Sequence, residues 1–209
     1  MLASSITSAM RTICSSLQIP VIVALMFILA VTLIVFGSVL VELIFERRYL
    51  KVWMPKLVDD LKAQEMSTEE TIQKSGLLKR QKMILIELTK HKELTPVMRE
   101  ALAVRLLTEY KARFEGILRI SDLIVKLGPA FGLLGTLIPL GPGIVALGQG
   151  DTYTLSQSLL TAFDTTIMGL SCAAVSTVIS SVRKRWYAND LSIMEALIEC
   201  ILEVEKENA

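Results

Sequence analysis

Three long stretches of the chain are almost free of charged residues. Residues 12–41 carry no charge, residues 127–150 carry none, and residues 152–182 carry a single acid, Asp164. A helix of about 20 mainly apolar residues is long enough to cross the hydrocarbon core of a bilayer. The pattern therefore predicts an all-α integral membrane protein. Three transmembrane helices are expected, at residues 19–44, 124–148 and 155–182.

Between and beyond these stretches the apolar residues recur every three or four positions, which is typical of amphipathic helices. Thr95-Pro96 is a helix-start signal, and no break follows it before Gly128-Pro129. The second span is therefore expected to continue a long helix that begins near residue 96. The third span is expected to continue as a helix over residues 183–209. Ser67 and Glu70 have the spacing of a capping box, which predicts another helix start.

Positively charged residues indicate the orientation. Seventeen of the 22 Lys and Arg residues lie in residues 46–126, four lie beyond residue 182, and the 149–154 connection has none. Lys and Arg concentrate in cytoplasmic segments. We therefore expect a cytoplasmic helical region at 45–123, a cytoplasmic C-terminal helix at 183–209, and a short outer loop at 149–154. The N-terminal segment, residues 1–18, is then extracytoplasmic.

Composition narrows the function classes. The net charge is +1, so no bulk charge attracts nucleic acid, and a hydrophobic content of 52% makes membrane lipid the expected surroundings. The single His91 and three widely separated cysteines do not provide the three or four close ligands of a zinc site. No acid pair or nucleophile–histidine set lies in the spans. We therefore expect no enzyme activity, no metal and no cofactor.

Small residues recur at helical spacing in the second and third spans. Such residues allow helix backbones to approach closely in lipid, which favours tight packing, and a narrow polar lining is the alternative. Pro139 and Pro142 are expected to distort the outer half of the second span. The packing residues proposed from the pattern are Gly128, Gly132, Gly135, Ala162, Gly169, Ala173 and Ser176.

Three polar residues lie near the middle of the predicted spans. Thr136 is ten residues from Lys126, about 15 Å along a helix, and Thr166 lies at a similar depth. In one interpretation, the two hydroxyls form a polar ring when several copies of the chain assemble. In the alternative, each hydroxyl donates a hydrogen bond to a carbonyl of its own helix. Asp164 is costly in a bilayer. Its carboxyl is either a neutral acid hydrogen-bonded to Thr161 or another span, or a waypoint for protons or cations.

The strings GPAFGLLGTLIPLG and SLLTAFDTTIMGLSCAAVS, which begin at residues 128 and 158, resemble the paired spans of the MotA/TolQ/ExbB proton channel family. Their proline- and glycine-rich character is more similar to the archaeal-type branch. The resemblance implies a homopentamer whose second and third spans surround a pore. It also implies a dimer of a single-span partner of ExbD/TolR/MotB type in that pore, which supplies a titratable Asp.

The resemblance assigns the two pore threonines to Thr136 and Thr166, with Thr165 beside them on the proton pathway. Relatives of ExbB type carry a Glu where this chain has Thr161, and Asp164 lies three residues further on. We expect Asp164 to take over an acidic role at the pore entrance or in helix packing.

The function expected from the resemblance is the channel-forming subunit of a motor complex in the cell membrane, driven by the proton motive force. The transported ion is H⁺, with Na⁺ as the alternative. A membrane scaffold that conducts no ions is the competing hypothesis, because small-residue packing suits it equally well.

Overall fold

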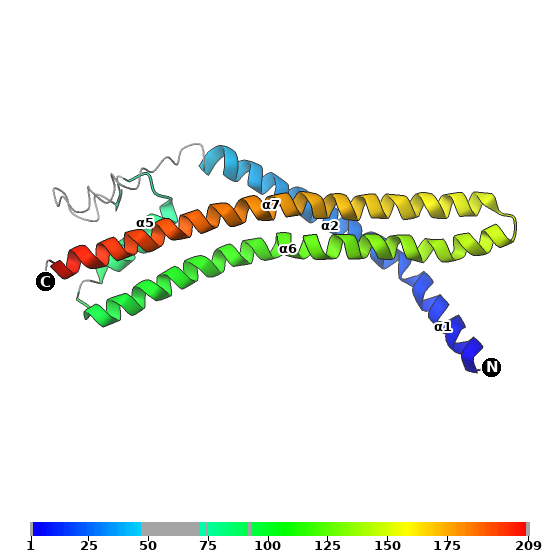
Figure 1. Cartoon of the computed structure of the whole chain (residues 1–209), viewed down its shortest axis with the longest axis horizontal. Coiled ribbons are helices and arrows are strands. Elements are labelled where there is room, and N and C mark those ends of the chain that lie inside the picture. Colours follow the sequence, from blue (N-terminus) through cyan, green and yellow to red (C-terminus); the bar gives the residue numbers. More distant parts are fainter. Residues whose placement is uncertain (1, 47–71, 74, 92, 208–209) are drawn as a thin grey trace. The chain divides into compact units, whose positions relative to one another are not determined.

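The computed structural model describes residues 2–46, 72–73, 75–91 and 93–207, and within them every regular element is a helix (Figure 1). The helices are α1 (Leu2–Ser16), α2 (Gln18–Val41), the π-helix η1 (Glu42–Glu46), α5 (Lys79–Lys90), α6 (Pro96–Gly148) and α7 (Thr152–Glu207).

Three helical segments are long and apolar enough to cross a membrane. They are Ala9–Ile44, Pro96–Gly148 and Thr152–Glu203. The helices α6 and α7 contain 53 and 56 residues, about 80 Å each, whereas a hydrocarbon core is about 30 Å thick. The expected all-α fold, with long helices that extend far beyond the second and third spans, is confirmed. Its orientation in the membrane stays a prediction.

The ends of α6 and α7 follow local sequence signals. Helix α6 begins at Pro96, directly after Thr95, where the sequence predicts a start. Asp151 caps α7, since its carboxylate accepts hydrogen bonds from the backbone N–H and the hydroxyl of Thr154, at 3.0 and 2.5 Å. These hydrogen bonds lower the pKa of the Asp151 carboxyl below its ordinary value. The turn between the helices places Gly150 at a φ of +80°, a conformation that favours glycine.

Two sequence predictions concern the prolines of the second span and a helix start at Ser67. Helix α6 runs without a break through Pro129, Pro139 and Pro142, so the two outer prolines do not end it. The distortion expected at Pro139 and Pro142 stays a prediction. The capping box predicted at Ser67 lies outside the described residues.

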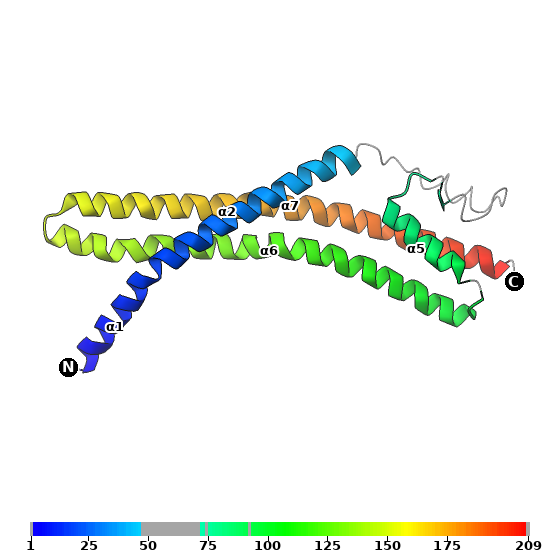
Figure 2. The ribbon, with the colours of Figure 1, turned by 180° about the vertical axis from the view of Figure 1, so that it is seen from behind.

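The chain divides into two compact units. The first comprises Met1–Val39 and Arg119–Ser181, and the second comprises Leu40–Leu118 and Val182–Ala209. In the first unit, α6 and α7 lie side by side and antiparallel, and α2 crosses them (Figures 1 and 2). Ile28 of α2, Ile124 of α6 and Cys172 of α7 form a buried apolar cluster there. The cluster joins all three predicted spans in one helical bundle.

Helices α5, α6 and α7 contribute to the core of the second unit. Leu85, Leu88, Met194 and Leu197 are fully buried in it. The Phe114 ring stacks on the Tyr187 ring at a centroid distance of 4.2 Å. The apolar face expected after the third span is therefore buried, as its periodicity predicts.

Glycines bring α6 and α7 into close contact in the first unit. A Cβ atom on Gly169 would lie 3.0 Å from the Gly132 Cα and closer still to the Gly128 carbonyl oxygen. A Cβ atom on Gly128 would lie 2.7 Å from the Gly169 carbonyl oxygen. These atoms belong to backbone, so no side-chain rotation relieves the overlap. The two helices can approach this closely only with glycine at both positions.

Replacing Gly169 by alanine is expected to destabilise the protein by about 1–3 kcal/mol, because the added methyl group separates the helices. Gly116→Ala is the matched control. A Cβ atom on Gly116 would meet nothing within 4 Å, so this change is expected to stabilise α6 by up to about 1 kcal/mol. Thermal melting of the purified protein measures both. A Gly169→Ala variant as stable as Gly116→Ala would contradict the close packing.

Candidate functional site

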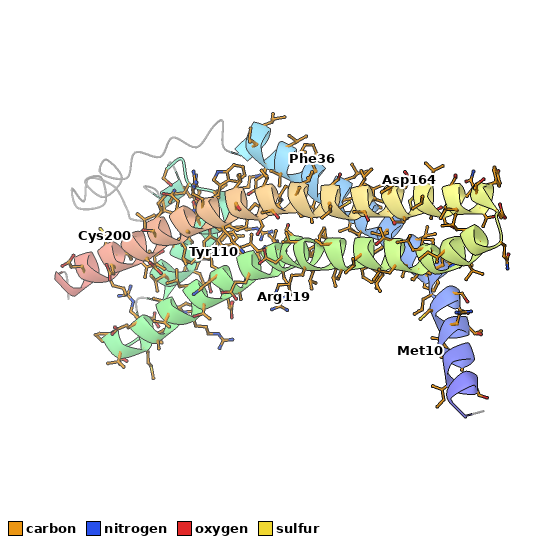
Figure 3. All side chains as sticks on the ribbon, turned by 45° about the vertical axis from the view of Figure 1, so that its right-hand side comes forward. Met10, Phe36, Tyr110, Arg119, Asp164 and Cys200 are labelled. Carbon is orange, nitrogen blue, oxygen red and sulfur yellow. The ribbon has the colours of Figure 1, made fainter. Side chains whose placement is uncertain are left out.

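Asp164 lies on the exposed side of α7 (Figure 3). Its neighbours Phe163 and Ile167 are also exposed, at 61% and 64%. The Thr161 hydroxyl donates to the Gln157 carbonyl at 3.0 Å. The alternative in which Asp164 is a neutral acid hydrogen-bonded to Thr161 or another span stays a prediction. Within the described part of the chain, no hydrogen bond or ion pair satisfies Asp164. Its carboxyl therefore lies on an exposed side of α7 between apolar side chains.

The two threonines predicted to line the pore differ in their hydrogen bonds. The Thr136 hydroxyl donates to the Leu133 carbonyl of its own helix at 2.7 Å. The Thr166 Oγ1 is buried and has no hydrogen-bond partner among the described residues. Thr166 lies in the α6–α7 contact, where a Cβ on Gly132 would come within 3.6 Å of its Cα. Thr166 therefore holds an unused hydroxyl at the depth predicted for the pathway.

Thr165 has a different position from its neighbours Asp164 and Thr166. It is 7% exposed, and its hydroxyl donates to the Thr161 and Ala162 carbonyls at 3.0 and 2.9 Å. A Cβ atom on Gly135 would lie 2.6 Å from the Thr165 Cβ. This arrangement favours a packing contribution from Thr165.

The small residues proposed for helix packing all lie at buried positions. They are Gly128, Gly132 and Gly135 on α6 and Ala162, Gly169, Ala173 and Ser176 on α7. Contacts between the two helices connect Gly128 with Gly169 and Gly135 with Thr165. Within this chain, the small-residue faces of α6 and α7 are therefore directed at each other.

A hydrogen bond across α6 and α7 was not anticipated from the sequence. The Ser180 hydroxyl donates to the Asp122 Oδ1 at 2.6 Å, and Ser180 is 4% exposed. Asp122 lies two residues before the predicted second span, so the sequence places it at a membrane boundary. The position of Asp122 beside a span boundary could have marked it as a functional residue. Its partner Ser180 could not be identified from the sequence, because the pairing depends on how α6 and α7 align.

A buried ion pair in the second unit was also missed. The Arg183 Nε lies 3.1 Å from the Glu42 Oε2, and the two side chains are 7% and 15% exposed. Glu42 lies near the C-terminal end of the first predicted span, and its ion-pair partner Arg183 is on α7. Both residues border predicted spans on the same side of the membrane, which is the signal that could have found the pair.

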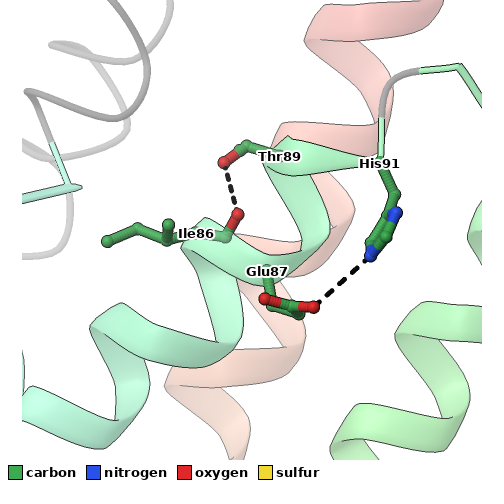
Figure 4. A network of polar contacts seen from close by, with 4 residues as sticks. All are labelled: Ile86, Glu87, Thr89 and His91. Atoms are coloured by element: carbon green, nitrogen blue, oxygen red, sulfur yellow. Dashed lines mark hydrogen bonds and ion pairs between the residues drawn. The ribbon is translucent and has the colours of Figure 1, made fainter.

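The histidine lies apart from these groups. His91 follows α5, is about half exposed, and its Nε2 lies 3.3 Å from the Glu87 Oε1 (Figure 4). The nearby Thr89 hydroxyl donates to the Ile86 carbonyl at 2.9 Å. Among the described residues, no group of three or more His, Cys, Asp or Glu side chains is arranged to hold a metal ion.

The second and third predicted spans lie in a region of the chain that matches a known protein family. The family model described as MotA/TolQ/ExbB proton channel family matches residues 64–196, which is well over half of the chain. The match includes α5, all of α6 and most of α7. No curated protein matches the chain. From the extent of the family match, the chain belongs to the MotA/TolQ/ExbB proton channel family.

Proposed function

We propose that the chain is the channel-forming subunit of a membrane motor complex driven by the proton motive force. Membership of a proton channel family supports a channel-type role in such complexes. In the proposed mechanism, H⁺ crosses the membrane where this chain meets a single-span partner of ExbD/TolR/MotB type. Proton movement then turns one component against the other. One charge that crosses 100 mV releases about 2.3 kcal/mol, enough to bias a step between two packed states.

The observation that carries the proposal is the exposed position of Asp164. An acid at the centre of a bilayer costs about 2.5–3.5 kcal/mol even on insertion scales. Lipid on this face would leave that cost uncompensated. Pore water or the polar group of another chain would compensate it, which supports an assembly with an ion pathway along α7.

Thr136 and Thr166 complete the proposed pathway. A threonine hydroxyl both donates and accepts hydrogen bonds, so it can hold a water molecule or a protonated group in place. The unused Thr166 hydroxyl is available for this role. The Thr136 hydroxyl can exchange its bond to the Leu133 carbonyl for a bond to water at small cost. Thr165 supports the pathway through its packing against Gly135.

The proposed assembly is a homopentamer in the cell membrane, with the N-terminus outside and the C-terminus in the cytoplasm. Two copies of the partner occupy the pore and supply the titratable Asp. Many apolar side chains of α6 and α7 are exposed in the single chain, among them Leu133, Leu137, Leu160 and Leu170. In the assembly, neighbouring copies and lipid cover these side chains.

Asp164→Asn tests the proposal. The change keeps the size of the side chain but removes its charge, so less positive charge is attracted to the pathway. We expect proton flux through the native complex in vesicles to fall about fivefold, which corresponds to about 1 kcal/mol of lost attraction. A pH-sensitive dye inside the vesicles measures the flux.

Asp151→Asn is the matched control, because asparagine also caps a helix and residue 151 lies in the loop before α7. Its flux is expected to equal that of the unaltered complex. Unchanged flux and assembly in Asp164→Asn would contradict the role assigned to Asp164.

A further inference from the structure

A second polar group lies between α6 and α7, far from Asp164 along the helix. It consists of Ser121 and Asp122 on α6 and Ser176 and Ser180 on α7, and we call these four residues the Asp122 cluster. The Asp122 carboxylate accepts the hydrogen bond from Ser180. Ser121 directly precedes Asp122, and Ser176 is one helical turn before Ser180. The cluster thus contains one carboxylate and three hydroxyls in one region of the helix contact.

Two of the hydroxyls in this cluster are fully buried and unsatisfied. Ser121 and Ser176 are each 0% exposed, and neither Oγ has a hydrogen-bond partner within the described residues. Other hydroxyls in the spans donate to a carbonyl one turn earlier, as Thr32 and Thr177 do at 2.7 and 2.8 Å. Ser121 and Ser176 do not use this option. Buried polar groups in folded proteins nearly always have a partner, so a partner from outside the chain is expected here.

Water suits this site better than an apolar ligand does. A buried water molecule typically makes two to four hydrogen bonds to groups that are otherwise unsatisfied. The two unsatisfied serine hydroxyls and the Asp122 carboxylate, which lie on the same two helices, provide donors and acceptors of this kind.

We propose that the Asp122 cluster binds buried water and forms the cytoplasmic exit for protons, an inference that rests on the proposed function. The cluster lies beside the predicted cytoplasmic ends of the second and third spans, at residues 124 and 182. A proton from the channel must reach bulk water at this boundary. A proton that arrives from the channel protonates the bound water, and this water passes a proton to the Asp122 carboxylate and becomes neutral again. The resulting carboxylic acid releases its proton to the cytoplasm, which restores the carboxylate.

The sign of a change in thermal stability decides whether water is bound. In a dry site, Ser121→Ala and Ser176→Ala would each remove an unsatisfied buried hydroxyl and would raise the melting temperature or leave it unchanged. In a hydrated site, each change removes a hydrogen bond to water. We expect each variant of the native complex to melt about 2–4 °C lower than the unaltered complex. Ser181→Ala is the matched control, since Ser181 is exposed on the same helix.

Proton flux in the same preparations tests the exit role. We expect flux to fall several-fold in Asp122→Asn and less in Ser121→Ala and Ser176→Ala, with no change in Ser181→Ala. A melting temperature that is unchanged or higher in both alanine variants would overturn the bound water. Unchanged flux in Asp122→Asn would overturn the exit.

Two further measurements distinguish bound water from a bound cation, and the proton exit from the rest of the pathway. First, the melting temperature is measured in sodium and in choline buffers. Stabilisation by sodium that is lost in Asp122→Asn would replace water with a bound cation and overturn the inference. Equal melting in both buffers supports water. Flux that falls in a Thr136→Ala, Thr166→Ala double variant but not in Asp122→Asn would overturn the exit and leave the proposed function intact.

Discussion

Replacing both Thr136 and Thr166 by alanine is expected to lower coupled proton flux by about five- to 150-fold while the oligomer stays intact. Each hydroxyl is expected to contribute about 0.5–1.5 kcal/mol as a hydrogen-bonding group on the pathway. Together they correspond to about 1–3 kcal/mol in the barrier, and each 1.4 kcal/mol is a factor of ten in rate. Flux of the native complex in vesicles, with a pH-sensitive dye, measures the loss.

Assembly should survive this double change because neither hydroxyl joins two elements of the chain. The Thr136 hydroxyl bonds to its own helix, and the Thr166 hydroxyl has no partner in the described structure. Thr177→Ala is the matched control, since its hydroxyl bonds to the Ala173 carbonyl of its own helix. If the double variant fails to assemble, the two threonines are packing residues and the pathway assigned to them is wrong.

Arg183→Ala is expected to cause the largest loss of stability among single changes. Arg183 and Glu42 form a buried pair at 3.1 Å, and removal of one partner leaves the other charge buried without its counter-ion. Such changes cost about 3–5 kcal/mol. The melting temperature of the complex should fall by about 10 °C. Intrinsic fluorescence during heating measures the shift.

Two further variants show whether the pair itself is responsible. Exchanging the two charges, with Glu42→Arg and Arg183→Glu in one chain, should recover part of the lost stability. Glu109→Gln removes one partner of an exposed pair, in which Arg105 and Glu109 are 78% and 63% exposed. Its effect should stay below about 1 kcal/mol. An Arg183→Ala variant that melts like Glu109→Gln would show that the buried pair does not stabilise the fold.

The sequence predicts the helical spans well because each depends on short-range information. Charge-free stretches indicate the spans, and Thr95-Pro96 indicates the start of α6. The small residues of α6 and α7 follow helical spacing, so their location on one face of each helix is also predictable. These features need no knowledge of which residues meet across the bundle.

The contacts between helices could not be predicted in the same way. The Asp122–Ser180 bond joins residues 58 positions apart, and the Glu42–Arg183 pair joins residues 141 positions apart. Each depends on the alignment of two helices, which the packing of whole faces determines. The sequence places these residues near the ends of spans but does not identify their partners.

In the candidate site, the sequence also does not show which of three consecutive polar residues faces the neighbouring helix. Asp164, Thr165 and Thr166 are consecutive, so their side chains point in directions about 100° apart on a helix. Contact with Gly135 buries Thr165, while Asp164 remains exposed. Composition alone identifies all three as polar residues in an apolar span. The rotation of α7 against α6 decides which of them faces the neighbouring helix.

Native mass spectrometry of the complex, extracted from its own membranes in mild detergent, shows whether the chain assembles with a partner as a motor complex does. We expect five copies of this chain with two copies of a small single-span protein that carries an Asp within its span. That partner would supply the titratable group of the pathway. A homo-oligomer that contains no partner after gentle extraction would contradict the account and favour a scaffold that conducts no ions.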